Sequence, residues 1–274
     1  MVKQAAKRTP RKATTGRSPA PTTPDDLSRD EDFSERGDKI SEIIARQIVR
    51  DIARRNLQPG TTLPAESVML QRFRVGRASL REALRILEVY GLIAIRPGPG
   101  GGPVVQAVTS RQFARTSTFY FHLHGATFGD LLDARRAIEP MMARLAAGGR
   151  DQGGLDRLGR DVAAARAAME AGDEDTWRRL TSEFHVEVAG ASGNHILDLF
   201  GQSLKDLYSE RLESRVIGRG DAKRVQKEHE AIHKAIVEGR AAQAERLMAD
   251  HMATFTSITS KAIPGLLDDV LDWR

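Results

Sequence analysis

The sequence predicts a mainly α protein in two parts, and three observations lead to this fold class. Apolar residues recur at helical spacing from residue 38 to 90 and again from 127 to 260. Two short β-type runs, 92–95 and 104–105, flank a tip rich in Gly and Pro. Charge also divides the chain, because residues 36–108 hold 12 Lys and Arg against 6 Asp and Glu, whereas residues 109–274 hold 23 against 25. We therefore expect a basic N-terminal domain followed by an all-α domain.

Length and composition limit the classes of protein. At the usual ~100–200 residues per domain, 274 residues suffice for about two domains. The absence of cysteine excludes a disulfide framework and a thiolate metal site. No run of 18 apolar residues and no secretory signal occurs. We therefore expect a cytoplasmic protein without a transmembrane helix.

Residues 1–35 are expected to form a disordered basic tail. They are rich in Pro, Thr, Ser and charge, and almost no large apolar residue precedes Phe33. Such a segment cannot bury enough surface to offset the entropy of ordering. The first 20 residues hold six Lys and Arg and no acidic residue. This cluster could lie along DNA phosphates or could be only a solvated tail.

Residues 36–108 are predicted to form three helices and a β-hairpin. Isoleucines at every fourth position, from Ile40 to Ile52, predict a helix over 38–55. Pro64 suits the start of a second helix, which extends to about residue 73. After a tight turn at Val75 and Gly76, a third helix spans 77–90 and ends at Gly91. The strands 92–95 and 104–105 then enclose the tip 97–103, which completes a winged helix-turn-helix plan.

The third helix has two different faces. Its apolar face holds Leu80, Ala83, Leu84 and Leu87. Arg77, Arg81 and Arg85 follow one another at four-residue spacing on the other side. A helix fits the major groove of B-DNA, and the planar arginine fork can grip guanine or phosphate. Alone, these arginines could be an ordinary solvated face, but the preceding helix, the turn and the wing favour DNA binding.

The stretch from "LQPGTTLPAES" to "GPGGGPVV" resembles the DNA-binding domain of the GntR family over about 50 contiguous residues. The matching pieces are Pro59-Gly60, Leu63-Pro64-Ala65-Glu66, Val75-Gly76-Arg77, Leu80-Arg81-Glu82-Ala83-Leu84, Leu87, Gly91-Leu92 and the glycine wing. The resemblance implies that Arg77, Ser79 and Arg81 contact a double-stranded DNA operator. It also implies that the wing tip enters the minor groove, with Arg96, Gly98 and Gly100 as its DNA-binding residues.

Residues 109–264 are expected to form the second domain. Thr127 and Asp130 fit a capping box at the start of a helix over 127–147. The further helices are predicted at 155–171, 174–190, 195–217, 222–238 and 241–260, with Gly at their joints. The last residues, 265–274, are expected to be a C-terminal tail.

Three histidines, His185, His229 and His251, lie on three different predicted helices. Neutral imidazole suits zinc, nickel and similar ions, and residues on separate helices can converge inside a bundle. The spacing is only weak support, because a helical histidine is more often a surface residue or a hydrogen-bonded core residue. His233 lies one turn after His229 and competes with it as a ligand.

Residues 127–255 resemble the FCD ligand-binding domain of FadR-like GntR proteins. The matching pieces are Leu132-Asp133-Ala134-Arg135, Ile138-Glu139-Pro140, Glu183-Phe184-His185, Ser192-Gly193-Asn194, Glu228-His229 and His251. The resemblance implies an antiparallel helical bundle in which His185, His229 and His251 bind a divalent metal, Zn or Ni. It implies that Arg135 clamps a small carboxylate effector. Thr181 departs from the pattern, since metal-binding members usually carry Asp or Asn one turn before the first histidine.

We therefore expect a homodimeric regulator of transcription, a repressor, that senses a small carboxylate and is not an enzyme. One alternative is a metal-dependent hydrolase that uses the three histidines and a bound water. It would need a general base, for which Glu183 and Glu187 are candidates by position. Another alternative is an architectural DNA-binding dimer without a ligand.

Overall fold

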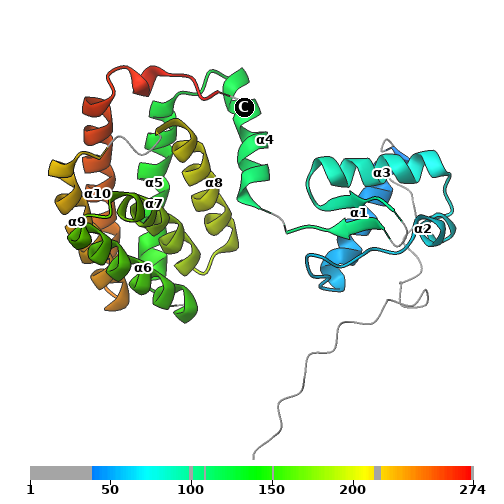
Figure 1. Cartoon of the computed structure of the whole chain (residues 1–274), viewed down its shortest axis with the longest axis horizontal. Coiled ribbons are helices and arrows are strands. Elements are labelled where there is room, and N and C mark those ends of the chain that lie inside the picture. Colours follow the sequence, from blue (N-terminus) through cyan, green and yellow to red (C-terminus); the bar gives the residue numbers. More distant parts are fainter. Residues whose placement is uncertain (1–38, 99–100, 108, 150, 213–216, 273–274) are drawn as a thin grey trace, which may run out of the picture. The chain divides into compact units, whose positions relative to one another are not determined.

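The computed structural model describes residues 39–98, 101–107, 109–149, 151–212 and 217–272. The chain divides into two compact units, residues 1–107 and 108–274 (Figure 1). The expected tail 1–35 and the wing residue Gly100 lie outside the described residues. Among the described helices, none combines the length and the apolar character that crossing a membrane requires.

The N-terminal unit contains α1 (Ile40–Arg54), α2 (Glu66–Phe73) and α3 (Arg77–Val89), close to the predicted ranges. α3 contacts both α1 and α2. The apolar faces of these helices form one core, which includes Ile44, Ile48, Met69, Leu80, Leu84 and Leu87. Arg74 ends α2 in the left-handed conformation, with φ of 52°, and so turns the chain between α2 and α3.

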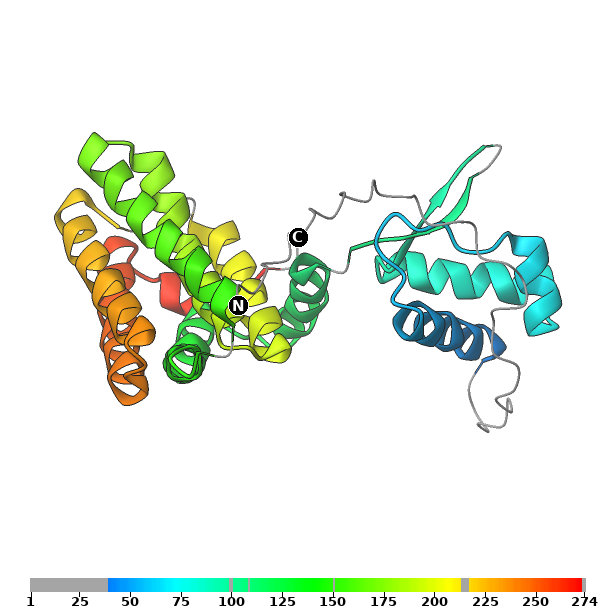
Figure 2. The same ribbon diagram turned by 90° about the horizontal axis from the view of Figure 1, so that it is seen from below.

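The wing consists of β1 (Ile93–Arg96) and β2 (Gly102–Val105), which pair antiparallel with Ile93 opposite Val105. Figure 2 shows this hairpin as a projection from the three helices. A Cβ on Gly101 would lie 2.2 Å from the carbonyl oxygen of Arg96, so the tip requires glycine there. The segment before α2 borders β2, since Leu63 N donates to Pro103 O at 2.8 Å. The predicted winged helix-turn-helix is therefore confirmed.

The second unit is all α. It contains α4 (Ser110–Leu123), α5 (Phe128–Ala146), α6 (Gln152–Ala171), α7 (Glu174–Ala191), α8 (His195–Leu212), α9 (Arg219–Val237) and α10 (Ala241–Ala262). α5 contacts α7, α8, α9 and α10, so it lies inside the bundle, while α6 packs on α7 and α4 packs on α8. Figures 1 and 2 both show these helices as a bundle. The expected helical domain is confirmed.

The sequence did not predict α4. This helix buries Ala114 and Thr118 and exposes larger apolar side chains such as Tyr120 and Leu123. Its apolar residues therefore do not mark the buried face, and the usual periodicity is lost. The capping box of Thr109 and Gln112 is the local signal that could have revealed it.

The expectation of a C-terminal tail over 265–274 was wrong for its described part. The chain forms the 3₁₀ helix η2 (Leu266–Asp268), and both Leu266 and Leu271 belong to the buried core. Leu271 N donates to Ala126 O at 2.8 Å, and Phe128 N donates to Asp269 O at 2.8 Å. Two buried leucines and these backbone bonds fix the segment against the start of α5.

Candidate functional site

The exposed face of α3 carries the three arginines that the sequence singled out. Arg77, Arg81 and Arg85 are all exposed, whereas Leu80 and Leu84 between them are buried in the core. The core therefore fixes the helix from behind and leaves its arginines free to meet a large partner. Their guanidinium groups suit phosphate and guanine.

Acidic residues partly restrain two of these arginines. Arg81 Nε lies 3.7 Å from Glu66 Oε2, and Arg85 NH1 lies 2.6 Å from Glu88 Oε2. Ser79 is half-buried on the same helix. On the wing, Arg96 and Gly98 are exposed. The structure thus leaves every described residue of the predicted DNA-binding set at least partly accessible.

The three predicted histidine ligands come together inside the helical unit. His185 lies on α7, His229 on α9 and His251 on α10, and one ring nitrogen of each lies within 4.8 Å of the other two. The Nε2 atoms of His229 and His251 are 3.1 Å apart. The ring of Phe184 stacks on the ring of His229, with 3.8 Å between the two ring centroids, and so fixes the plane of that imidazole. His233, the competing candidate, is not in this cluster.

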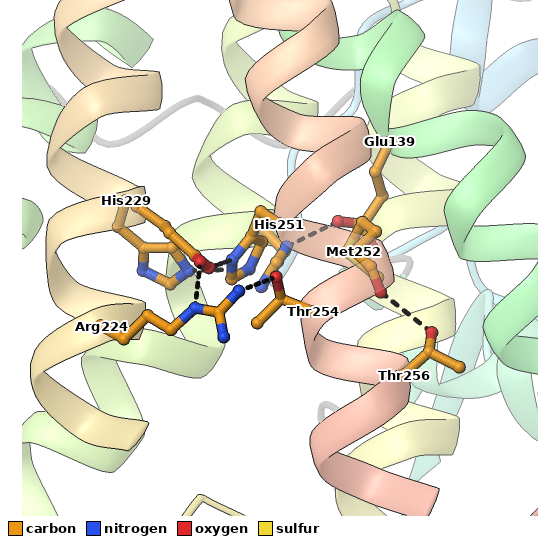
Figure 3. A network of polar contacts seen from close by, with 9 residues as sticks. Glu139, Arg224, His229, His251, Met252, Thr254 and Thr256 are labelled. Carbon is orange, nitrogen blue, oxygen red and sulfur yellow. Dashed lines mark hydrogen bonds and ion pairs between the residues drawn. The ribbon is translucent and has the colours of Figure 1, made fainter. Parts of the chain in front are cut away.

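Two carboxylates hold the outer nitrogens of this cluster. His185 Nδ1 bonds Glu139 Oε2 at 2.6 Å, and His251 Nδ1 bonds Glu228 Oε2 at 2.8 Å. A carboxylate accepts only from a protonated nitrogen, so each bond leaves Nε2 of that ring to face the cluster. Figure 3 labels Glu139, His229 and His251, which lie on α5, α9 and α10.

The charges in the site follow from burial and pairing. Burial would raise the pKa of Glu139, but the charge of Arg135, the charge that His185 carries when protonated, and the hydrogen bonds of both residues lower it to about 2. Burial lowers the pKa of His185, although Glu139 opposes this. Burial and the neighbouring histidines hold the pKa of His229 well below its usual value. At neutral pH His185 and His229 are therefore neutral, as metal ligands must be.

The donor set fits a zinc-like ion. Tetrahedral zinc with Zn–N bonds of about 2.0–2.1 Å places its nitrogens about 3.3 Å apart, close to the 3.1 Å between His229 and His251. Outer carboxylates that orient the imidazoles are the usual second layer of such sites. Three protein ligands leave a position open for an oxygen from solvent or from an effector.

A cavity of about 390 Å³ adjoins the histidines. Arg135 lines the same cavity, and its side chain is buried. Its Nε donates to Glu139 Oε1 at 2.6 Å, and its guanidinium lies over the rings of Tyr208 and Phe255. The cavity therefore brings the predicted effector residue and the predicted metal ligands to one place.

Thr181 also lines this cavity, one turn before His185 on α7. Its Oγ1 is buried and makes no hydrogen bond to any described residue. A hydroxyl is a poor ligand for a zinc-like ion, so the candidate ligands that the structure brings together are the three imidazoles. Thr181 and the three histidines thus line the same cavity.

Sequence reasoning missed several residues of this site. Glu139 and Glu228 both stand in the motifs quoted above, and the four-residue spacing of Arg135 and Glu139 could have suggested an ion pair. Lys205 and Tyr208 reach the cavity from α8, and no local pattern marks them. Lys205 Nζ pairs with Glu183 Oε1 at 2.5 Å.

Both units match known protein families. Residues 40–101 match the bacterial regulatory proteins of the gntR family, and residues 130–254 match the FCD domain. The chain is similar to the transcriptional regulator LutR of Bacillus subtilis, with 28% identity over 209 residues, 74% of this chain and 94% of that protein. It is 28% identical over 222 residues to the Glc operon transcriptional activator of Escherichia coli, covering 78% of this chain and 87% of that one.

The repressor NanR of Cronobacter sakazakii is 29% identical over 171 residues, covering 61% of this chain and 64% of its own. Among solved structures, a GntR protein of Streptococcus agalactiae matches with a TM-score of 0.62 and 25% identity, covering 79% of this chain and 99% of that one. A winged helix-turn-helix joined to an effector-binding bundle defines a ligand-responsive, DNA-binding transcriptional regulator. The chain belongs to the GntR family of bacterial regulatory proteins, and its helical unit is an FCD domain.

Proposed function

We propose that this regulator senses a small carboxylate through a divalent metal, Zn or Ni, held by His185, His229 and His251. The single observation that supports this most is that Arg135 and the three histidines line one cavity. A bound metal would supply positive charge and an open coordination position for an oxygen. Arg135 would bind a carboxylate of the same ligand through its remaining N–H groups.

Elemental analysis of protein purified without a polyhistidine tag tests the metal. We expect close to one equivalent of zinc or nickel, and less than about a tenth of an equivalent, with no stabilisation by added zinc, would contradict the proposal. His229→Ala should abolish binding. His233→Ala is the matched control, because His233 lies one turn away on α9 but outside the cluster.

Replacing Thr181 by Asp tests the ligand geometry. An added carboxylate beside three imidazoles should tighten metal binding, because Asp is a common fourth ligand for such ions. Isothermal titration with zinc measures the change. Unchanged affinity would mean that Thr181 does not face the metal position.

A thermal shift screen of small carboxylates tests the effector class. Arg135→Lys should weaken or abolish the stabilisation, since lysine cannot make the bidentate pair. Arg136→Ala is the control, because Arg136 is exposed and pairs with Asp133 outside the cavity. If uncharged analogues stabilise the protein equally well, the proposed carboxylate is wrong.

We also propose a homodimer. α4 and α8 pack on each other and carry exposed apolar residues, and Tyr120, Leu123 and Ile196 are each more than half exposed. Such a surface favours association with a second copy, and a dimer matches the two-fold symmetry of many operators. Light scattering should give twice the monomer mass, and Leu123→Lys should reduce it.

We further propose that the regulator acts in the cytoplasm, where its DNA target lies, and represses its operator until the effector binds. The names of its relatives include both an activator and a repressor. A promoter fusion therefore decides the sign, and deletion of the regulator should raise expression. Effector can change operator affinity only if it binds one arrangement of the dimer more tightly.

In the part of the chain that the structure describes, both candidate bases of the hydrolase alternative are already paired with cations. Glu183 is paired with Lys205, and Glu187 with Arg157 at 3.2 Å. Glu187 does not line the cavity, although partial burial raises its pKa. We propose that the protein has no turnover activity, which assays of metal-loaded protein with ester, amide and phosphate substrates would test.

A further inference from the structure

The histidines of the site differ in how their outer nitrogens are held. His185 is held by Glu139, which is itself buried and paired with buried Arg135. His251 is held by Glu228, whose second oxygen accepts from Arg224 Nε at 2.9 Å. The side chain of Arg224 is 61% exposed. One histidine is thus supported from inside the cavity and the other from the protein surface.

The surface support joins two helices. Arg224 and Glu228 lie one turn apart on α9, while His251 lies on α10. Arg224 NH2 also donates to Thr254 Oγ1 on α10 at 2.8 Å, as the dashed lines in Figure 3 show. Arg224 therefore fixes Glu228 and anchors it against α10 within one turn of His251. A second cavity, of about 520 Å³, is lined by Arg224, Glu228 and His251, so this network is open to solvent from outside.

We infer that Glu228 and Arg224 are positioning residues for His251. Glu228 accepts the Nδ1 proton and so keeps Nε2 of His251 directed at His229 and His185. Arg224 holds Glu228 in the orientation that this bond requires. Through these two successive hydrogen bonds, the surface residue Arg224 influences the affinity of the three-histidine site for metal. Only the part of the inference that concerns metal affinity rests on the proposed function. The part that concerns the tautomer of His251 does not.

The reason is the limited number of protons on a neutral imidazole. With one proton, the ring can donate at Nδ1 or at Nε2 but not at both. Without an acceptor at Nδ1 the proton can move to Nε2, where it faces Nε2 of His229 at 3.1 Å and blocks coordination. If His251 already carries its proton on Nδ1 before the metal binds, the ring does not have to change tautomer when it coordinates the metal.

The first test measures the tautomer of His251 in the metal-free protein by long-range ¹H–¹⁵N correlation spectroscopy. We expect the Nδ1–H tautomer in the unmodified protein and a shift toward Nε2–H in Glu228→Ala. Glu228→Gln keeps an acceptor oxygen and should restore the Nδ1–H form. Arg224→Gln should give an intermediate population.

The second test measures Co²⁺ affinity by competition. Glu228→Ala should weaken it about 10–100-fold, the usual effect of losing such a partner, and Arg224→Gln should weaken it by about 3–10-fold. Arg144→Gln is the matched control. Arg144 is 56% exposed and pairs with Glu245 of α10 at 2.8 Å, but neither residue lines the cavities near the histidines.

These outcomes separate the inference from the proposed function. A tautomer unchanged in Glu228→Ala overturns the inference, whether or not metal binds. If the unmodified protein binds Co²⁺ and both variants match Arg144→Gln, the inference is also overturned. If the unmodified protein binds no metal while the tautomer shifts as expected, the proposed metal function fails and the positioning role stands.

Discussion

Arginine occupies opposite environments in the two units. On α3 the arginines are exposed, and the pairs that Arg81 forms with Glu66 and Arg85 with Glu88 lie at the surface of the unit. In the helical unit Arg135 is buried, bonded to Glu139 at 2.6 Å and covered by two aromatic rings. An exposed cation can meet a large polyanion from outside. A buried cation must be neutralised by the protein, and only its remaining N–H groups are available inside the cavity.

The largest effect is expected from a substitution in the core beneath α3, which should destabilise the N-terminal unit and not the helical unit. Leu80→Ala should destabilise the N-terminal unit by about 2–5 kcal/mol, because Leu80 is fully buried and its loss leaves a cavity. Hydrogen exchange should show the loss in α1–α3 but not in α5–α10. Val89→Ala, at an exposed position on the same helix, should change little. Equal loss of protection in both units would show that they do not fold independently.

Removing an exposed arginine should affect DNA and nothing inside the bundle. Arg77→Ala should cost about 1–3 kcal/mol of operator binding if this residue contacts a base. Fluorescence anisotropy measures the affinity, and zinc binding should remain unchanged. Arg136→Ala, on the helical unit, is the control. If the Arg77→Ala variant binds the operator as tightly as the unmodified protein, Arg77 does not contribute to the DNA interface.

Acid should destabilise the helical unit first, because all seven histidines lie after residue 107. The pKa of His185 and that of His229 are lowered from 6.5, so in metal-free protein the unfolded state takes up protons before the folded state. Stability should therefore fall as the pH drops below about 6.5. Glu139, with a pKa of about 2, adds a further loss as pH falls below its usual 4.5.

Both tryptophans lie in the second unit, and Trp177 is buried, so tryptophan fluorescence during denaturant titration reports on this unit. His229→Gln should reduce the change in the free energy of unfolding between pH 7 and pH 5. A free energy of unfolding that stays constant over that range would show that the histidines are not neutralised by burial.

The smallest effect is expected from the N-terminal tail. Deleting residues 1–35 should change the free energy of unfolding by less than about 0.5 kcal/mol, since their composition does not support a core. The same deletion tests the basic cluster. Weaker operator binding with a smaller salt slope would mean that the cluster contacts phosphates, whereas unchanged binding would mean a solvated tail.

The two units also differ in what their sequences reveal. The helix ranges of the N-terminal unit were predicted closely, because its core repeats at helical spacing along each element. In the helical unit the sequence does not predict α4, and it predicts a tail at 265–274, where the structure has the buried residues Leu266 and Leu271. Both errors have one cause. These segments are held by partners distant in sequence, and their own apolar pattern does not show the buried face.

By itself the sequence determined the fold class and the arginine face of α3, since both depend on local periodicity, while the resemblance to the FCD domain singled out the three histidines as candidate ligands. Only the tertiary structure decided that Glu139 and Glu228 hold the outer nitrogens of His185 and His251, and that Arg135 shares their cavity. These partners come from α5, α7, α9 and α10. A buried charge requires a partner within a few ångströms, and which residues satisfy that requirement depends on how the helices pack rather than on their order in the chain.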